Sequence, residues 1–463
     1  MSFSSKTVLL PAVKHADVMG RYLKLIPDEL EGKINADGGS GGGGGGSSSN
    51  DNANSTVNAW KGSGIVFDWP GVQLTFQNVR NTTTVKIKMR GGLSVFGYRV
   101  VPRISADKKN DNNGDIENED DRSHDEVLNT YGFLGISNAE REYELATNLD
   151  PQSSYKVQIW KQDDPGNGIV KIVGLVVDNG GTADEKKEEE DGNDSTNNTR
   201  RRTIEFVGDA DVLGFLNMTN TTTRRMSALF LAPVLTLGGP RMRKGTDVSK
   251  AWPVLVAKEL NRRTKDVVDW QIIAKTEICC AKYQDEYPSM AEVYAYSMYD
   301  EWRVLQSGDR DGKSLSPVDA VCLYIGQDDQ GALGGQFMKN TERLVDGFLA
   351  LLNRIRQVRG PKTKVVVIVP TWDCVLSRIG SEKGRAFTAS SQNDLWKQAV
   401  QQMGGEEKNF FVVENQHDPQ IALGGRDDFG LMLQWNASSH SKFAAGLADK
   451  LKPILDFSWK DGS

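Results

Sequence analysis

Residues 203–458 contain five strand-like segments that alternate with amphipathic helical segments, and this alternation constrains the fold more than any other feature. The expected strands cover residues 204–207, 270–274, 320–325, 364–369 and 410–414. The expected helices cover residues 248–262, 290–304, 336–359, 390–403 and 439–455. Repeated strand–helix units predict a flavodoxin-like, doubly wound parallel sheet with helices on both faces. Ligands of such sheets bind at the carboxyl ends of the strands, so the functional residues are expected there.

The first part of the chain, residues 1–180, has a different pattern. Apolar and polar residues alternate in segments 64–69, 72–76 and 84–89, and two further strand candidates, 155–160 and 169–177, flank a turn-rich stretch. Short strands joined by turns predict a jelly-roll-like β-sandwich. A chain of 463 residues is also long enough for two cores, so an all-β domain followed by an α/β domain is expected.

Three segments have a biased, polar composition. Residues 37–58 are almost entirely Gly, Ser and Asn, whereas residues 107–126 and 180–202 are rich in charged residues and Asn. None of them contains enough apolar surface to offset its ordering entropy, so all three are expected to be mobile. The first two are interpreted as insertions in the sandwich, and residues 181–202 as the linker between the domains.

The composition argues against several classes of protein. Hydrophobic residues make up 38% of the chain and charged residues 25%, which is the balance of a globular protein. No apolar run approaches the roughly 20 residues that span a bilayer, so a membrane protein is not expected. The net charge of −6, with Lys and Arg scattered, argues against nucleic-acid binding. The first 20 residues lack the features of a signal peptide, which favours a cytoplasmic location.

Two glycine-containing motifs fall where expected strands end. The first strand leads into Gly-Asp-Ala at residues 208–210, and the third leads into Gly-Gln-Asp-Asp at residues 326–329. Both resemble blocks of the SGNH hydrolases, in which Gly-Asp-Ser supplies a nucleophile and Gly-x-Asn-Asp supplies an oxyanion-hole amide. With the sandwich in front, the whole chain resembles carbohydrate esterase family 2, two-domain acetylesterases that deacetylate polysaccharides. Further matching segments are residues 20–21, 62–65, 155–161 and 204–209.

This resemblance implies a carboxylic-ester hydrolase that acts on acetylated carbohydrate without a cofactor. Within the matching motifs, Gly208, Asp209 and Gly326 are the expected binding residues. Trp435, close to the last block, is a candidate for stacking on a sugar ring or for core packing.

The departures from the family pattern fall on the chemistry itself. The nucleophile position holds Ala210, whose methyl group cannot attack an acyl carbon. The oxyanion position holds Asp328, and an ionised carboxylate would repel the anion that an amide stabilises. The glycine after the second strand is matched by Cys279, whose side chain is expected to obstruct a close backbone approach. The sequence therefore predicts a degenerate active site.

The family's Asp-x-His block matches the start of the last helix in two ways. An alignment without gaps places Asn436 on the acid and Ser438 on the histidine, whereas a two-residue gap makes His440 the general base. With His440 as the base, an active enzyme would need a replacement nucleophile such as Ser438, Ser439 or a cysteine. Packing is the more common role of a cysteine such as Cys279 or Cys280.

Two functions remain open at this point. One is an impaired carbohydrate acetylesterase, and the other is a pseudoenzyme that binds a glycan or a protein partner without turnover. The acidic residues that end the first and third strands raise the further possibility of a Ca²⁺ or Mg²⁺ site, but helix capping and loop hydrogen bonds are the favoured explanation, so no metal is expected. These four residues are Asp209, Asp211, Asp328 and Asp329.

Overall fold

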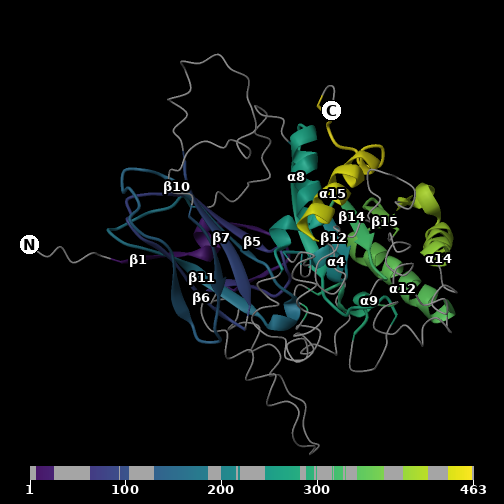
Figure 1. Ribbon diagram of the computed structural model, residues 1–463, viewed down its shortest axis with the longest axis horizontal. Coiled ribbons are helices and arrows are strands. Elements are labelled where there is room, and N and C mark those ends of the chain that lie inside the picture. The colour runs from purple at the N-terminus through teal and green to yellow at the C-terminus, as the bar shows by residue number, and fades with distance from the viewer. Residues whose placement is uncertain are drawn as a thin grey trace, which may run out of the picture.

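The structure of the protein is a computed structural model, which consists of a β-sandwich followed by an α/β domain (Figure 1). The description below covers residues 7–25, 63–92, 94–103, 130–185, 200–214, 217–218, 246–281, 288–296, 299, 315, 317–326, 329, 341–369, 389–414 and 436–460.

The sandwich consists of two antiparallel sheets. The first has the order β3-β4-β11-β6-β9, and β1 also pairs with β11. Its strands are β1 (Val8–Pro11), β3 (Leu23–Leu25), β4 (Gly64–Phe67), β6 (Val85–Gly91), β9 (Arg141–Ala146) and β11 (Val170–Val177). The second has the order β2-β5-β10-β7-β8. Its strands are β2 (Ala16–Met19), β5 (Gln73–Val79), β7 (Val95–Pro102), β8 (Thr130–Gly135) and β10 (Tyr155–Lys161). Helix α1 (Ala12–His15) joins β1 to β2, and the short helix η2 (Pro165–Asn167) lies between β10 and β11.

Period-two patterning places the core of the sandwich between these sheets. In β6, Val85, Ile87 and Met89 are buried while the lysines between them are partly exposed. The alternation in β10 is the same, and Trp69, for which packing was favoured, is fully buried. The predicted β-sandwich is therefore confirmed.

The second domain contains a five-stranded parallel sheet with the order β13-β12-β14-β15-β16. Its strands are β12 (Arg201–Gly208), β13 (Val267–Ala274), β14 (Ala320–Tyr324), β15 (Lys364–Ile368) and β16 (Phe410–Val413). Its helices are α4 (Ala210–Leu213), η3 (Val248–Lys250), α8 (Trp252–Arg263), α9 (Met290–Val293), α12 (Thr341–Arg359), α14 (Ala389–Gln402), η6 (Gly405–Lys408) and α15 (Ala437–Leu451). All five predicted strands are present, in the flavodoxin-like order.

The helices cover both faces of this sheet, as the strand–helix pattern predicts. Helices α8 and α15 pack together on one face, and α12 packs with α9 and α14 on the other (Figure 1). Side chains alternate along a strand, so neighbouring residues of β14 face different cores. Cys322 packs on the face that α8 and α15 cover, whereas Val321 and Leu323 pack on the face that α12 and α14 cover.

Two boundaries differ from the predictions. Strand β12 begins at Arg201, inside the predicted linker, and Thr182 pairs with Arg80 of the sandwich, so both ends of segment 180–202 are held in place. Helix α9 ends at Val293, earlier than predicted. The biased segments 37–58 and 107–126 lie outside the described residues. Among the described helices, none is long and apolar enough to cross a membrane.

A buried ionic cluster joins the two domains. Arg21, which follows β2, donates to the Glu205 carboxylate in β12 at 2.8 Å. Arg359 at the end of α12 and the hydroxyl of Tyr294 also donate to Glu205. Although burial favours a neutral carboxyl, the charges of Arg21 and Arg359 lower the pKa of Glu205 to about 2. Two of the sequence segments that carry the family resemblance, 20–21 and 204–209, thus meet in a structural ion pair.

The turn between β10 and β11 makes further contacts with the α/β domain. The Asp164 carboxylate accepts hydrogen bonds from the Thr276 amide at 2.7 Å and from its hydroxyl at 2.6 Å. The Gln162 amide donates to Asp247 at 3.1 Å. Since Thr276 follows the carboxyl end of β13, the sandwich borders the edge of the sheet where ligands are expected.

Candidate functional site

The first predicted motif lies at the carboxyl edge of the sheet. Strand β12 ends at Gly208, where a Cβ atom would lie 1.9 Å from the Tyr324 carbonyl oxygen, so only glycine permits this approach of β12 to β14. Asp209 and Ala210 follow at once, and Ala210 is the first residue of α4. The residue is 4% exposed. The position that the sequence resemblance assigns to a nucleophile therefore holds a buried alanine at the start of a helix.

Asp209 connects the two motifs. Its carboxylate is fully buried and accepts a hydrogen bond from the Gly326 amide at 3.2 Å. Gly326 has a φ of +114°, in the region that favours glycine. The structure thus brings together four predicted site residues at the ends of β12 and β14: Gly208, Asp209, Ala210 and Gly326. The Asp209 carboxylate accepts a hydrogen bond from the loop after β14, which is one of the two structural roles that the sequence suggested for it.

Asp329 connects the third strand to the second. Its buried carboxylate accepts hydrogen bonds from the backbone amides of Cys280 at 2.9 Å and Ala281 at 3.1 Å. Burial raises the pKa of Asp329 to about 6, although these two amides oppose the shift. This carboxylate therefore holds the loop after β13 against the end of β14.

The cysteines beside this contact are buried thiols. Cys279 is 7% exposed and Cys280 is 1% exposed. Burial, with the nearby Asp329 carboxylate, raises the pKa of Cys280 well above its ordinary value. A nucleophilic cysteine needs a lowered pKa and access to solvent, so Cys280 lacks the environment of a replacement nucleophile.

His440 lies on the buried face of α15. The residue is 1% exposed, and its Nδ1 atom accepts a hydrogen bond from the Trp252 amide at 3.2 Å. Trp252 is the first residue of α8, and the amides of a first helical turn have no partner within the helix. Burial lowers the pKa of His440 to about 3. With Nδ1 accepting, the proton of the neutral ring is on Nε2, so neither nitrogen is arranged to take a proton from a nucleophile.

The start of α15 lies beside the segment that follows α4, because the Ala437 amide donates to the Asn217 carbonyl at 2.8 Å. Asn436 caps this helix, and its side-chain oxygen accepts from the Ser439 amide at 3.0 Å and from its hydroxyl at 3.1 Å. Ser439 is buried, whereas Ser438 is exposed. Of the two residues that the alignments place on the family histidine, Ser438 faces solvent and His440 faces the core.

Two predicted site residues, Asp328 and Trp435, lie outside the described residues, as do segments 219–245, 282–287, 330–340, 370–388 and 415–435 that follow the strands. Within the described part of the chain, no three His, Cys, Asp or Glu side chains gather as a metal site would require. The acidic cluster that includes Asp328 stays a prediction.

No protein-family model and no curated protein matches the sequence. Solved structures do match. A family two carbohydrate esterase from Cellvibrio japonicus aligns over 98% of this chain and 99% of its own, with a TM-score of 0.60 and 14% identity. The chain has the two-domain fold of the family two carbohydrate esterases. A Clostridium thermocellum esterase of the same family, in complex with cellohexaose, aligns over 84% of this chain and 94% of its own (TM-score 0.55, 15% identity). The acetyl xylan esterase Est2A of Butyrivibrio proteoclasticus aligns over 97% and 98% (TM-score 0.55, 10% identity).

Proposed function

We propose that this protein binds carbohydrate at the carboxyl edge of its α/β sheet and has lost most or all of the acetylesterase chemistry of its fold. The observation that carries the proposal is Ala210, a buried alanine at the start of α4, where the family resemblance expects a nucleophile. Loss of the nucleophile from a serine hydrolase costs roughly a million-fold in turnover.

The other candidate catalytic groups also support the loss of the esterase chemistry. The Asp209 carboxylate already accepts from the Gly326 amide, and Asp329 accepts from two loop amides, so both acids are engaged in holding loops. The ring of His440 caps α8. A hydroxyl at Ser438 would therefore have no oriented base among these residues.

Carbohydrate is the ligand class that the fold supports best. Solved structures that share both domains are named carbohydrate esterases, and one of them is in complex with cellohexaose, an oligosaccharide without an acetyl ester. Binding a glucan chain therefore does not depend on the reaction. The sandwich borders the same edge through Asp164 and Thr276, so both domains can contribute to a glycan site.

Titration calorimetry of the full chain tests this proposal, with cellohexaose and with an acetylated xylo-oligosaccharide as ligands. We expect saturable binding of at least one of them, without release of acetate. In Ala210→Gln, a longer side chain projects at the carboxyl edge, and the affinity should fall.

Ala445→Gln, the same substitution at an exposed position of α15, is the matched control and should bind as the wild type does. The absence of binding by either ligand would refute the glycan proposal. Equal affinity in Ala210→Gln would place the glycan site elsewhere on the molecule.

A further inference from the structure

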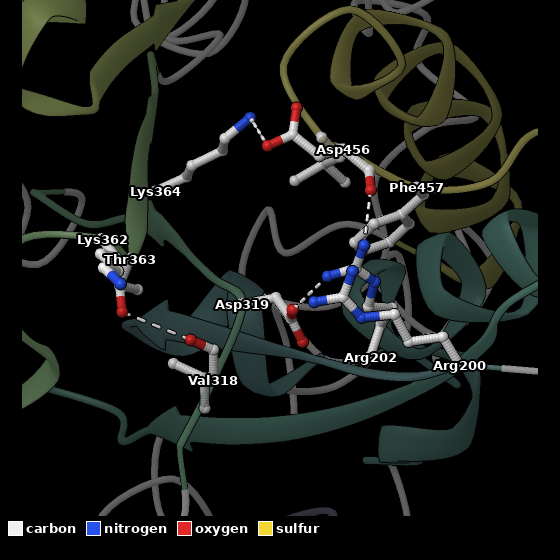
Figure 2. A pocket seen from close by; sticks show the side chains of 10 residues that line it. Arg200, Arg202, Val318, Asp319, Lys362, Thr363, Lys364, Asp456 and Phe457 are labelled. Atoms are coloured by element: carbon white, nitrogen blue, oxygen red, sulfur yellow. Dashed lines mark hydrogen bonds and ion pairs between the residues drawn. The ribbon is translucent and has the colours of Figure 1, made fainter. Parts of the chain in front are cut away.

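A cavity of about 240 Å³ opens at the amino ends of the strands, at the edge of the sheet opposite to Ala210 (Figure 2). It lies where β12, β14 and β15 begin, and the segment after α15 closes one side. Four cations and two carboxylates line it: Arg200, Arg202, Lys362, Lys364, Asp319 and Asp456. Cations therefore outnumber carboxylates by two.

The cations lie at or directly before the starts of two strands. Arg202 is the second residue of β12 and Arg200 precedes this strand, whereas Lys364 is the first residue of β15 and Lys362 lies in the turn before it. Since β14 lies between β12 and β15, the two pairs approach the cavity from both sides of β14.

The charge of Arg202 is compensated within the protein. Its guanidinium donates to Asp319 at 2.7 Å and to the Asp456 carbonyl at 2.6 Å, and it lies 3.5 Å from the Asp266 carboxylate. It also stacks on the Phe457 ring at 5.3 Å. Asp319 in turn accepts from the Thr203 amide at 2.8 Å. Arg202 and Asp319 therefore pair with each other in the lining of the cavity and leave little net charge there.

The other cations are differently placed. Lys364 pairs with Asp456 at 2.8 Å and also donates a hydrogen bond to the Ile454 carbonyl. The Asp456 side chain is 82% exposed, so solvent screens the ion pair and much of the Lys364 charge remains available to an anion. Within the described part of the chain, the side chains of Arg200 and Lys362 have neither a hydrogen bond nor an ion pair. Figure 2 shows Arg200 and Lys362 on opposite sides of the cavity. Uncompensated like charges around one cavity favour a bound anion.

We propose that this cavity binds a tetrahedral oxyanion, a phosphate or sulfate group, between Arg200, Lys362 and Lys364. A guanidinium and two ammonium groups can together donate to several oxygens of such a group, and charge-assisted bonds of this kind are the strong ones. The volume is below the range of about 300–1,000 Å³ typical of sites for drug-sized ligands, so the ligand is a small anion or the charged end of a sugar derivative. This site lies at the opposite edge of the sheet and does not depend on the proposed glycan site.

Thermal unfolding of the full-length protein at constant ionic strength tests the proposal, with inorganic phosphate, inorganic sulfate or glucose 6-phosphate replacing chloride. We expect the Tm to rise saturably with at least one of these anions, because a ligand that binds only the folded state stabilises it. In Arg200→Ala/Lys362→Ala, the apparent affinity should fall by about ten-fold or more for each cation removed. Tighter binding of glucose 6-phosphate than of phosphate would identify a group carried on a sugar, and the reverse order would identify the free ion.

The control variant is Arg141→Ala/Lys258→Ala, which removes two exposed cations of β9 and α8 and should bind as the wild type does. Both substitutions in the test variant are at exposed positions, and circular dichroism verifies its fold. No saturable shift with any of the three anions, or an unchanged affinity in Arg200→Ala/Lys362→Ala, would overturn the proposal.

Discussion

The Nδ1 atom of His440 accepts a hydrogen bond from the backbone amide of Trp252, 188 residues earlier in the chain. This contact places the only histidine near the last family block inside the core shared by α8 and α15, where it satisfies an amide that the helix cannot satisfy itself. A histidine with this role stabilises the fold and is poorly placed to activate a nucleophile.

The first prediction concerns the pH dependence that His440 imparts. Burial lowers its pKa from 6.5 to about 3, so below pH 6.5 the unfolded chain binds a proton that the folded chain excludes. Stability should therefore be lost as the pH falls from 6.5 towards 3, and His440→Asn should reduce this loss while its amide oxygen still accepts from Trp252.

Urea unfolding between pH 4 and pH 7 measures this difference, with His440→Ala as a comparison that leaves the amide unsatisfied at a cost of about 1–3 kcal/mol. Identical pH profiles for wild type and His440→Asn would contradict the capping role.

The second prediction concerns the ionic cluster between the domains. Glu205→Gln removes the carboxylate that Arg21, Arg359 and Tyr294 share and should destabilise the protein by about 3–5 kcal/mol. Because the pKa of Glu205 is lowered from 4.5 to about 2, its contribution is present above pH 4.5 and is lost as the pH falls towards 2. Chemical denaturation at pH 7 and pH 4 measures both effects.

The control is Glu259→Gln, which breaks partly exposed pairs with Arg262 and Arg263 on α8. Its cost should not exceed about 1 kcal/mol. Equal costs for the two variants would show that burial adds nothing to the Glu205 cluster.

The third prediction concerns Asp329. Its pKa in the folded protein, about 6, lies above the ordinary value of 3.8, so the folded chain binds the proton more tightly. The wild type should therefore lose stability relative to Asp329→Asn as the pH rises from about 4 to 6, opposite in sign to the effect of His440. A difference between the two proteins that stays constant from pH 4 to pH 7 would disprove this assignment.

Much of the fold could be predicted because its patterns are local. The alternation in β6 and β10 and the strand–helix repeats from β12 to α15 each follow from burial of one face. No prediction covered β8 or β9, because the exposed edge strands of a sheet have little alternation to detect: in β9, only Leu145 and Ala146 are buried. Strand β1 ends in Pro11, which obscures its pattern in the sequence.

Only part of the candidate site could be predicted from the sequence. Topology alone placed Gly208, Asp209 and Gly326 together, since neighbouring parallel strands end at one edge. The burial of His440 had a signal that was not used: it lies three residues before Phe443 and seven before Leu447, on the apolar face of α15. The cations at the amino edge were missed because ligands of such sheets are expected at the opposite edge.

The fourth prediction tests whether a hydroxyl group at position 210 restores ester hydrolysis. Ala210→Ser should recover little hydrolysis, because its hydroxyl would have no oriented base. Adding Asp328→Asn, which removes a negative charge from the predicted oxyanion position, should raise the rate more than either change alone, since such groups act as a unit. Steady-state rates of the two single variants and the double variant measure this. Family-like turnover by Ala210→Ser alone would mean that the site is intact apart from the nucleophile.

The most direct measurement is the steady-state release of acetate from acetylated xylan by the purified wild-type protein. With Ala210 at the predicted nucleophile position and His440 buried against Trp252, we predict release at the rate of the buffer. His440→Ala serves as a control for contaminating esterases, whose activity would not depend on this residue. Robust turnover by the wild type that disappears in His440→Ala, when that variant remains folded, would contradict the loss of catalysis.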